Sequence, residues 1–154
     1  MMHRVKFASL LALLIAVLGA LCVPTADAEC TAATIGNTYG FHFDGLAGPA
    51  AATALKLSAF VPATGVGEMS FTATSDTGGT ISGFQNLSFG GVQIQPTFTG
   101  TYTVNAPKCT GRIAVMFPDG AGPHLNFVIV KGGEEIQWLQ TDAGVVLQGV
   151  MEKE

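Results

Sequence analysis

Charged residues are scarce in this sequence. Asp, Glu, Lys and Arg together make up 12% of its 154 residues, and only 7 residues are Lys or Arg. Beyond the first six residues there is no Lys/Arg cluster, which is the feature that proteins use to bind phosphate backbones. Nucleic acid is therefore excluded as an expected partner.

The residue patterns that usually mark a catalytic or metal site are also absent. The sequence contains no H-x-H, H-x-x-H or H-E-x-x-H metal-binding pair and no G-x-S-x-G nucleophile motif. After the first 28 residues the only histidines are His42 and His124, and neither has a partner pattern around it. A solvent-facing or locally hydrogen-bonded role is expected for both. We predict no catalytic residue, no metal site and no cofactor.

The longest hydrophobic run lies at the N-terminus. A basic segment at residues 1–6 precedes a nearly pure apolar run, Phe7 to Val23, and Ala26-Asp27-Ala28 is a small-x-small cleavage site. This three-part pattern predicts a helical secretory signal peptide over residues 1–28, cleaved after Ala28. A single domain over residues 29–154 would remain.

A retained membrane anchor is the alternative for this run. The run falls a little short of the roughly 20 residues that a spanning helix needs. A lipoprotein is disfavoured because Leu21 precedes Cys22 and Glu29 precedes Cys30, where a small residue is required. The sequence thus predicts an exported protein, periplasmic or extracellular, that meets the membrane only through its signal peptide before cleavage.

Cysteines are few as well. Of the 3 cysteines, Cys22 would leave with the signal peptide, so Cys30 and Cys109 would remain in an oxidising compartment. An even number there predicts one disulfide, Cys30–Cys109. Closing so long a loop is worth about 4–5 kcal/mol in the chain-entropy model. A metal site or a reactive thiol is a poor alternative, since no histidine neighbours either cysteine.

What the sequence does contain is strand alternation. In the stretch PTFTGTYTVNAPKCTG, Pro96 to Gly111, the residues from Thr97 to Val104 alternate between threonine and an apolar residue or glycine, and a turn cluster at Asn105 to Lys108 follows. Such a period predicts a half-buried strand. We expect Phe98 and Tyr102, with Phe127 and Ile129 on a later strand, to be buried. The threonines at positions 97, 99, 101 and 103 are expected to be exposed.

Similar patterns recur along the chain, separated by Gly-, Asp- and Pro-rich turns. The expected strands are Thr38–Asp44, Ala54–Val61, Val66–Thr74, Thr80–Phe89, Val92–Val104, Thr110–Phe117, His124–Lys131, Glu134–Thr141 and Val145–Met151. Pro62 is expected to end the second of them, and Ala50-Ala51-Ala52 to form one helical turn at most.

Short connections between sequential strands predict an all-β fold, because parallel crossovers need longer links. Closure removes the exposed edges of such a sheet. We therefore expect an antiparallel up-and-down meander closing into a barrel of about eight strands, with a two-sheet sandwich as the alternative. At that size the interior is either filled by side chains or holds one small ligand.

An ordered set of short motifs spans nearly the whole predicted domain. They are Cys30, Gly36 to Phe41, Thr99 to Gly111, Phe127 to Ile136 and Thr141 to Gly149. This set resembles a family of small secreted bacterial β-barrel proteins, mostly uncharacterised, that are similar in architecture to allene oxide cyclase and dirigent barrels. The segment from Phe71 to Asp76 and one extra residue before Cys109 depart from the family pattern.

The resemblance implies a barrel that binds an apolar ligand or serves a structural role without catalysis. A cyclase or isomerase acting inside an allene oxide cyclase-like barrel is the alternative. The aromatic residues form a packed core on the simplest interpretation. On the sharper one they line a pocket, with Tyr39, Phe41, Tyr102 and Trp138 as the expected contacts of a small apolar ligand. Tyr102 is the strongest of these, because it follows Gly100 on the same face of its strand.

Overall fold

The computed structural model describes residues 30–49 and 58–154 of the chain. The predicted signal peptide, residues 1–28, and the possible helical turn at Ala50-Ala51-Ala52 lie outside the described residues. The elements are η1 (Ala32–Ile35), β1 (Thr38–Ala47), β2 (Val61–Ser75), β3 (Gly78–Phe89), β4 (Val92–Ile94), β5 (Thr97–Asn105), η3 (Ala106–Lys108), β6 (Thr110–Phe117), β7 (Gly120–Val130), η4 (Lys131–Gly133), β8 (Glu135–Gln140) and β9 (Val145–Lys153).

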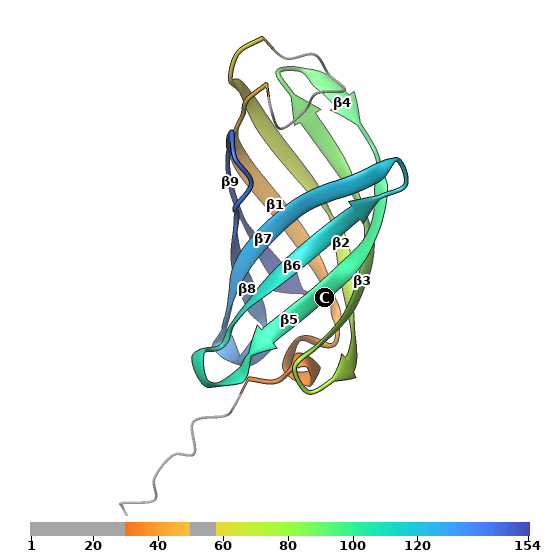
Figure 1. The fold of residues 1–154 in the computed structure, drawn as a ribbon, viewed down its shortest axis with the longest axis vertical. Coiled ribbons are helices and arrows are strands. Elements are labelled where there is room, and N and C mark those ends of the chain that lie inside the picture. Colours follow the sequence, from red (N-terminus) through yellow and green to blue (C-terminus); the bar gives the residue numbers. More distant parts are fainter. Residues whose placement is uncertain (1–29, 50–57) are drawn as a thin grey trace, which may run out of the picture.

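The strands form an antiparallel barrel (Figure 1). Their order is β2-β1-β9-β8-β7-β6-β5-β3, and the additional pairing of β2 with β3 closes the ring. The short strand β4 pairs with the last residues of β3, where it continues the line of β5. This confirms the all-β, closed, eight-stranded prediction and rules out the sandwich. In the part of the chain that the structure describes, no helix has the length and hydrophobicity to cross a membrane.

Strand alternation assigned the inner face correctly. Phe98, Tyr102, Phe127 and Ile129 are each at most 5% exposed. The four threonines of β5 face solvent. His42 is exposed between two buried phenylalanines of β1, as its parity predicted.

The strand predicted over Ala54–Val61 is wrong in its described part. Residues 58–60 are not in a strand, and β2 begins at Val61 and continues through Pro62. Residues 54–57 lie outside the described ranges. Pro62 is tolerated because it is the second residue of β2, where a missing N–H costs little. Its carbonyl still accepts a hydrogen bond from the Gly90 N–H at 2.8 Å.

The strand predicted over Val92–Val104 is interrupted. Gln95 and Pro96 separate β4 from β5. Pro96 has no N–H to donate to the sheet, although its carbonyl accepts from the Gln85 N–H at 3.1 Å. Pro96 therefore interrupts the strand, but β3 still pairs with β5 and the barrel stays closed.

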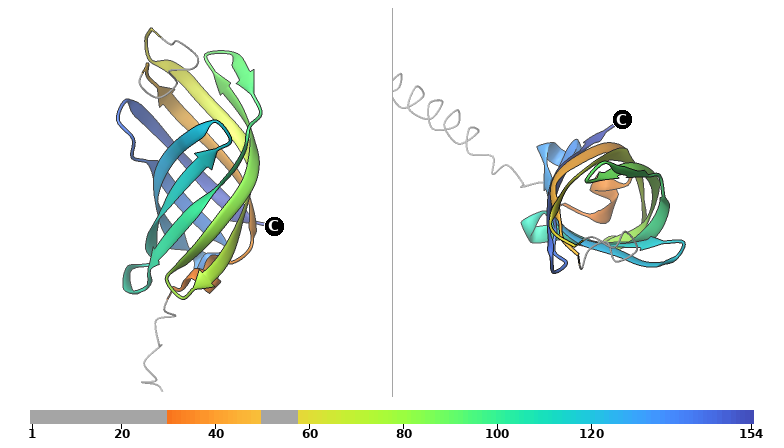
Figure 2. Two further views of the ribbon diagram at one scale, coloured as in Figure 1. Left: turned by 45° about the vertical axis from the view of Figure 1, so that its right-hand side comes forward. Right: turned by 90° about the horizontal axis from the view of Figure 1, so that it is seen from above.

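The two ends of the barrel differ. At one end, η1 lies across the interior of the ring of strands (Figure 2), and its residues Ala32 and Ile35 are fully buried. We call η1 the plug and this end the plugged end. The predicted disulfide is confirmed there: Cys30, just before η1, is bonded to Cys109 after β5, with 5.1 Å between their Cα atoms. The open end carries the β3–β4, β6–β7 and β8–β9 turns.

Candidate ligand-binding cavity

The half of the barrel next to η1 is filled. The ring of Phe71 packs edge-on between Tyr39 and Tyr102, with ring centroids 5.5 Å and 5.1 Å apart. Such edge-to-face contacts are the preferred geometry of aromatic pairs. Ile113 and Ile136 are also almost completely buried.

Both buried phenols in this half have hydrogen-bond acceptors. The Tyr39 hydroxyl donates to the Gly133 carbonyl at 2.6 Å, and the Tyr102 hydroxyl donates to the Ala32 carbonyl of η1 at 3.3 Å. Burial, together with the charge of Glu134 and the neighbouring Tyr102, raises the pKa of Tyr39 to about 12. Burial also raises the pKa of Tyr102. The two hydroxyls are therefore neutral donors: the one of Tyr102 connects β5 to the η1 plug, and the one of Tyr39 connects β1 to η4.

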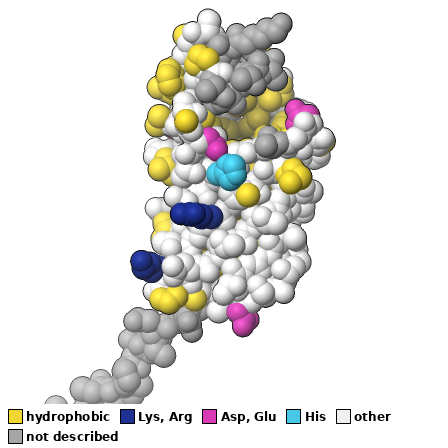
Figure 3. Space-filling view, in the orientation of Figure 1, with side chains coloured by type: hydrophobic (Ala, Val, Ile, Leu, Met, Phe, Trp, Pro, Cys, Tyr) yellow, Lys and Arg dark blue, Asp and Glu magenta, His cyan; other side chains and the backbone are white. Residues whose placement is uncertain are grey.

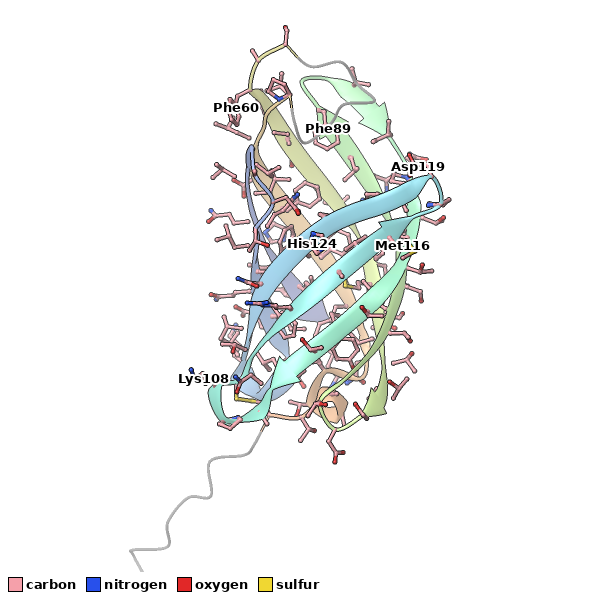
Figure 4. The ribbon with its side chains drawn as sticks, in the orientation of Figure 1. Phe60, Phe89, Lys108, Met116, Asp119 and His124 are labelled. Atoms are coloured by element: carbon pink, nitrogen blue, oxygen red, sulfur yellow. A yellow bond between two sulfur atoms is a disulfide. The ribbon has the colours of Figure 1, made fainter. Side chains whose placement is uncertain are left out.

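The other half is hollow. A cavity of about 670 Å³ occupies it and opens at the end opposite the plug. In Figure 3, hydrophobic side chains are visible inside a hollow toward the upper end. Phe89 and Asp119, which line the cavity, lie at this end, whereas Lys108 lies at the plugged end (Figure 4). The volume falls within the range of small-molecule sites, roughly 300–1,000 Å³.

The cavity wall is mainly apolar. Besides the aromatic rings described next, its apolar side chains are Ala47, Met69, Leu87, Phe89, Ile94, Pro96, Val115, Phe117, Pro118, Pro123, Leu125, Ala143, Val145, Leu147 and Met151. Its polar side chains are Gln85, Gln140, Asp119 and Asp142. Among the residues that the structure describes, neither Lys nor Arg lines the cavity.

Four aromatic residues, Phe41, Phe43, Phe98 and Trp138, line the cavity where it meets the filled half. Phe41 and Phe43 stack with centroids 6.4 Å apart, and Phe41 also lies 6.4 Å from Phe98. Phe43 meets Trp138 edge-on at 5.7 Å. These rings form one continuous aromatic surface.

Each of these rings lies over a glycine of a neighbouring strand. A Cβ atom added to the glycine would come within 2.7 Å of the ring, for the pairs Phe43–Gly65, Phe41–Gly67, Phe98–Gly83 and Trp138–Gly149. The rings thus occupy the space of the missing side chains, an arrangement that also stabilises glycine in a sheet. Because they lie over the wall, four large side chains leave the centre of the barrel open.

The Trp138 side chain lines the cavity, but its indole N–H is buried in the wall. Trp138 is 8% exposed, and its Nε1 is buried with no hydrogen-bond partner among the described residues. Buried polar groups in proteins are nearly always paired, so an unpaired donor requires an explanation.

Asp142, in the β8–β9 turn, has a structural role at the open end. Its carboxylate accepts hydrogen bonds from the His124 backbone N–H at 2.8 Å and from Gln140 Nε2 at 3.0 Å. His124 Nδ1 lies 2.8 Å from the other carboxylate oxygen. Burial alone would raise the pKa of Asp142, but these hydrogen bonds outweigh it and lower the pKa. The ionised carboxylate holds the turn against β7.

A shallower recess of about 560 Å³ lies on the outer face of β5, β6 and β7. It contains Thr101, Thr103, Arg112, Asn126 and His124. Of the described residues, no three His, Cys, Asp or Glu side chains are grouped so as to hold a metal ion. The recess offers no convergent chemistry, and the internal cavity is the stronger candidate site.

The four residues predicted to contact a ligand lie in two different parts of the barrel. Phe41 and Trp138 are on the cavity wall, whereas Tyr39 and Tyr102 lie beside the plug and are not among the inner lining residues. Ligand contact by any of the four stays a prediction. Phe43, Phe98 and Leu147 also line the cavity. Phe43 and Phe98 belong to the aromatic set that the sequence offers as a possible pocket wall, but none of the three was singled out as a ligand contact.

No family model matches the chain, and no curated protein matches it either. Three solved barrels are similar in structure. They are a de novo designed fluorescence-activating β-barrel (14% identity, 80% of this chain and 96% of that one, TM-score 0.57), the redesigned barrel mFAP0 bound to DFHBI (16%, 78% and 99%, 0.54) and EF1p2_mFAP2b bound to DFHBI (12%, 83% and 100%, 0.58). At these identities the similarity shows the fold alone, that of a small β-barrel.

Proposed function

We propose that this chain is an exported, non-catalytic binding protein that holds one small, mainly apolar molecule in the open half of its barrel. The observation that carries the proposal is the cavity of about 670 Å³ with its largely apolar wall. An open apolar volume of this size is costly to leave in water and is typical of ligand sites. Two of the similar barrels are bound to DFHBI, which supports the capacity of this fold to enclose a small molecule.

The position of the ionisable groups supports binding over catalysis. The two carboxylates that line the cavity, Asp119 and Asp142, belong to turns at the open end. Asp142 is already occupied by His124 and Gln140. A general acid or base would need to reach the reacting group of an enclosed ligand. Carboxylates at the rim of the cavity are poorly placed for this, which favours binding over catalysis.

Two features support export. The Cys30–Cys109 disulfide is of the kind that persists in oxidising compartments. The first 28 residues carry the basic, apolar and small-residue regions of a signal peptide. Mass measurement of the protein secreted to a bacterial periplasm, expected to begin at Glu29, tests this part.

The binding function is tested with two neighbouring residues of β9. Leu147 lines the cavity and is 6% exposed, while Val146 faces outward and is 62% exposed. Leu147→Trp fills the cavity, and Val146→Trp is the matched control. The probe is N-phenyl-1-naphthylamine, a neutral dye whose fluorescence rises in apolar surroundings.

We expect the dye to bind the parent protein and the Val146→Trp variant with similar affinity, and the Leu147→Trp variant at least tenfold more weakly. Thermal melting establishes that both variants are folded. Equal dye binding by a folded Leu147→Trp variant would show that the cavity is not the binding site.

A further inference from the structure

We propose that the ligand carries a hydrogen-bond donor, a hydroxyl or an equivalent N–H, and that the side-chain carbonyl of Gln140 accepts from it near the open end of the cavity. This inference rests on the proposed binding function and names the chemical class of the ligand, an apolar body with a donor at its outer end. Gln140 orients such a ligand and selects it among apolar molecules of similar shape.

Two glutamines, Gln85 and Gln140, place accessible polar atoms on the cavity wall. Both line the cavity and are half-buried. Within residues 30–49 and 58–154, nothing pairs with the Gln85 carboxamide or with Gln140 Oε1. The one unpaired side-chain N or O atom that is fully enclosed in these residues is Trp138 Nε1. The unpaired atoms of the two glutamines are therefore open to a ligand, whereas the indole N–H is not.

Both side chains point into the barrel. Gln140, the last residue of β8, lies two residues after the buried Trp138 and pairs with the buried Leu125 of β7. Gln85 lies two residues before the buried Leu87 of β3. Residues two apart in a strand share a face. Because β3 and β8 are four strands apart in either direction around the ring, the two carboxamides lie on opposite walls.

The Asp142 carboxylate determines which end of the Gln140 amide is free. Gln140 Nε2 donates to Asp142 Oδ2 at 3.0 Å. An ionised carboxylate only accepts hydrogen bonds, so the amide must turn its NH₂ group to Asp142, and its carbonyl Oε1 is the free acceptor. Gln85 has no such partner, and its carboxamide can turn to offer either a donor or an acceptor. Of the two glutamines, Gln140 therefore has a fixed preference, which is for a donor.

The surroundings of Gln140 favour a donor at the same place. Asp142 also lines the cavity, and its side chain is 33% exposed. Its negative charge attracts the positive end of an O–H or N–H dipole and repels the oxygen of an ether or carbonyl. Deeper in the cavity, the wall is aromatic, with Phe41 and Phe98 in contact. A ligand with a flat apolar end and a donor at the other end matches both regions.

The first experiment uses the unmodified protein and a matched pair of probes. 4-Phenylphenol and 4-methoxybiphenyl share two rings and one oxygen, and only 4-phenylphenol has a hydrogen-bond donor. Nuclear Overhauser contacts show which ring of a bound probe lies beside which side chain. We expect the hydroxyl-bearing ring of 4-phenylphenol to contact Gln140 and its other ring to contact Phe98. The reverse orientation would overturn the role of Gln140.

The second experiment removes the acceptor. Gln140→Met deletes the carboxamide and keeps the length of the side chain, and Gln85→Met is the same change on the opposite wall. Titration calorimetry gives the affinities of both probes for each protein, and thermal melting establishes that the variants are folded. We expect the preference for 4-phenylphenol over 4-methoxybiphenyl to fall about tenfold in Gln140→Met, the value of one hydrogen bond in binding. It should be unchanged in Gln85→Met.

The outcomes separate this inference from the binding function. If 4-phenylphenol binds with the same preference in the parent and in Gln140→Met, or if the preference falls only in Gln85→Met, the role of Gln140 is wrong and the binding function stands. The same holds if the parent binds N-phenyl-1-naphthylamine but not 4-phenylphenol. If the parent binds neither of these molecules, both proposals fail. Should Gln140→Met not fold, the orientation of 4-phenylphenol in the parent decides.

Discussion

The two halves of this barrel are built from the same strands and have opposite interiors. Near the plug, η1 contributes Ala32 and Ile35 to the centre, and two phenols bond to backbone carbonyls of η1 and η4. Toward the open end, four large rings lie over glycines and the centre is a cavity. An eight-stranded barrel is just wide enough to be filled or to hold one small ligand. Here η1 fills one half, and in the other half the rings lie against the wall and leave a cavity.

The largest effect should come from releasing the plug. Replacing Cys30 and Cys109 together by serine removes the bond across 79 residues of sequence. Loss of a native disulfide from a small domain costs about 2–5 kcal/mol of unfolding free energy. Urea unfolding of the variant, and of the parent with and without reductant, measures this cost. A loss below about 1 kcal/mol would mean that packing of η1 holds the plug without the disulfide.

A pair of truncations compares the two interiors directly. Ile113 is 1% exposed in the filled half, and Leu147 lines the cavity. Ile113→Ala should leave a new void and cost about 3–4 kcal/mol, whereas Leu147→Ala enlarges an existing space and should cost at least about 1 kcal/mol less. Chemical denaturation of both variants tests the difference. Equal losses would contradict the contrast between a filled and a hollow half.

Two glycines sharpen the same comparison. A Cβ at Gly111 would come within 2.2 Å of Phe127, in the filled half, and a Cβ at Gly149 within 2.6 Å of Trp138, beside the cavity. Both also meet a backbone carbonyl, so each substitution by alanine should destabilise by about 1–3 kcal/mol. We expect Gly111→Ala to cost more, since the Trp138 ring has space to shift. Thermal melting ranks the stabilities of the two variants. A shifted Trp138 fluorescence maximum in Gly149→Ala, but not in Gly111→Ala, would support a movement of the Trp138 ring.

The smallest expected effect concerns Tyr39 at high pH. Its pKa is raised from 10.0 to about 12 in the folded protein, so its contribution to stability is present below pH 10 and is lost as pH rises through 12. Tyr39→Phe should cost about 1 kcal/mol at neutral pH through the lost hydrogen bond. Between pH 10 and 12, the free energy of unfolding should also decline less steeply in the Tyr39→Phe variant than in the parent. Unfolding curves at pH 8, 10 and 11.5 test this, and an equally steep decline in the variant would show that other groups control it.

Much of the wall could be predicted from the sequence, because alternation is a local property. The inward-facing residues of β5 followed from strand alternation. The Cys30–Cys109 pair followed from the number of cysteines. Whether inward side chains meet in the centre depends on strands far apart in the chain. The placement of Trp138 over Gly149 or of Phe41 over Gly67 therefore had no signal in either strand alone. The plug was missed because Ala32–Ile35 is too short to show a helical period.

Similar reasons explain the errors in the site. Tyr102 follows Gly100 and faces inward, and this suggested a pocket beside its hydroxyl. The segment that accepts the Tyr102 hydrogen bond lies 70 residues earlier, beyond the reach of any local pattern. In the sequence, Trp138 is one aromatic residue among several. Its distinguishing property, the lack of an acceptor, exists only in three dimensions.

The pairing of the first strand with the last also determines when the cavity can form. Tyr39 lies opposite Lys153 in the β1–β9 ladder, so more than a hundred residues must be brought together before the ring closes. Folds dominated by such distant contacts assemble in roughly milliseconds to seconds. Until β9 docks, the edges of β1 and β8 are unpaired and the aromatic wall is open to water. Binding competence should therefore arise in the final step of folding, and a ligand that enters the cavity would act mainly on the rate at which the finished barrel reopens.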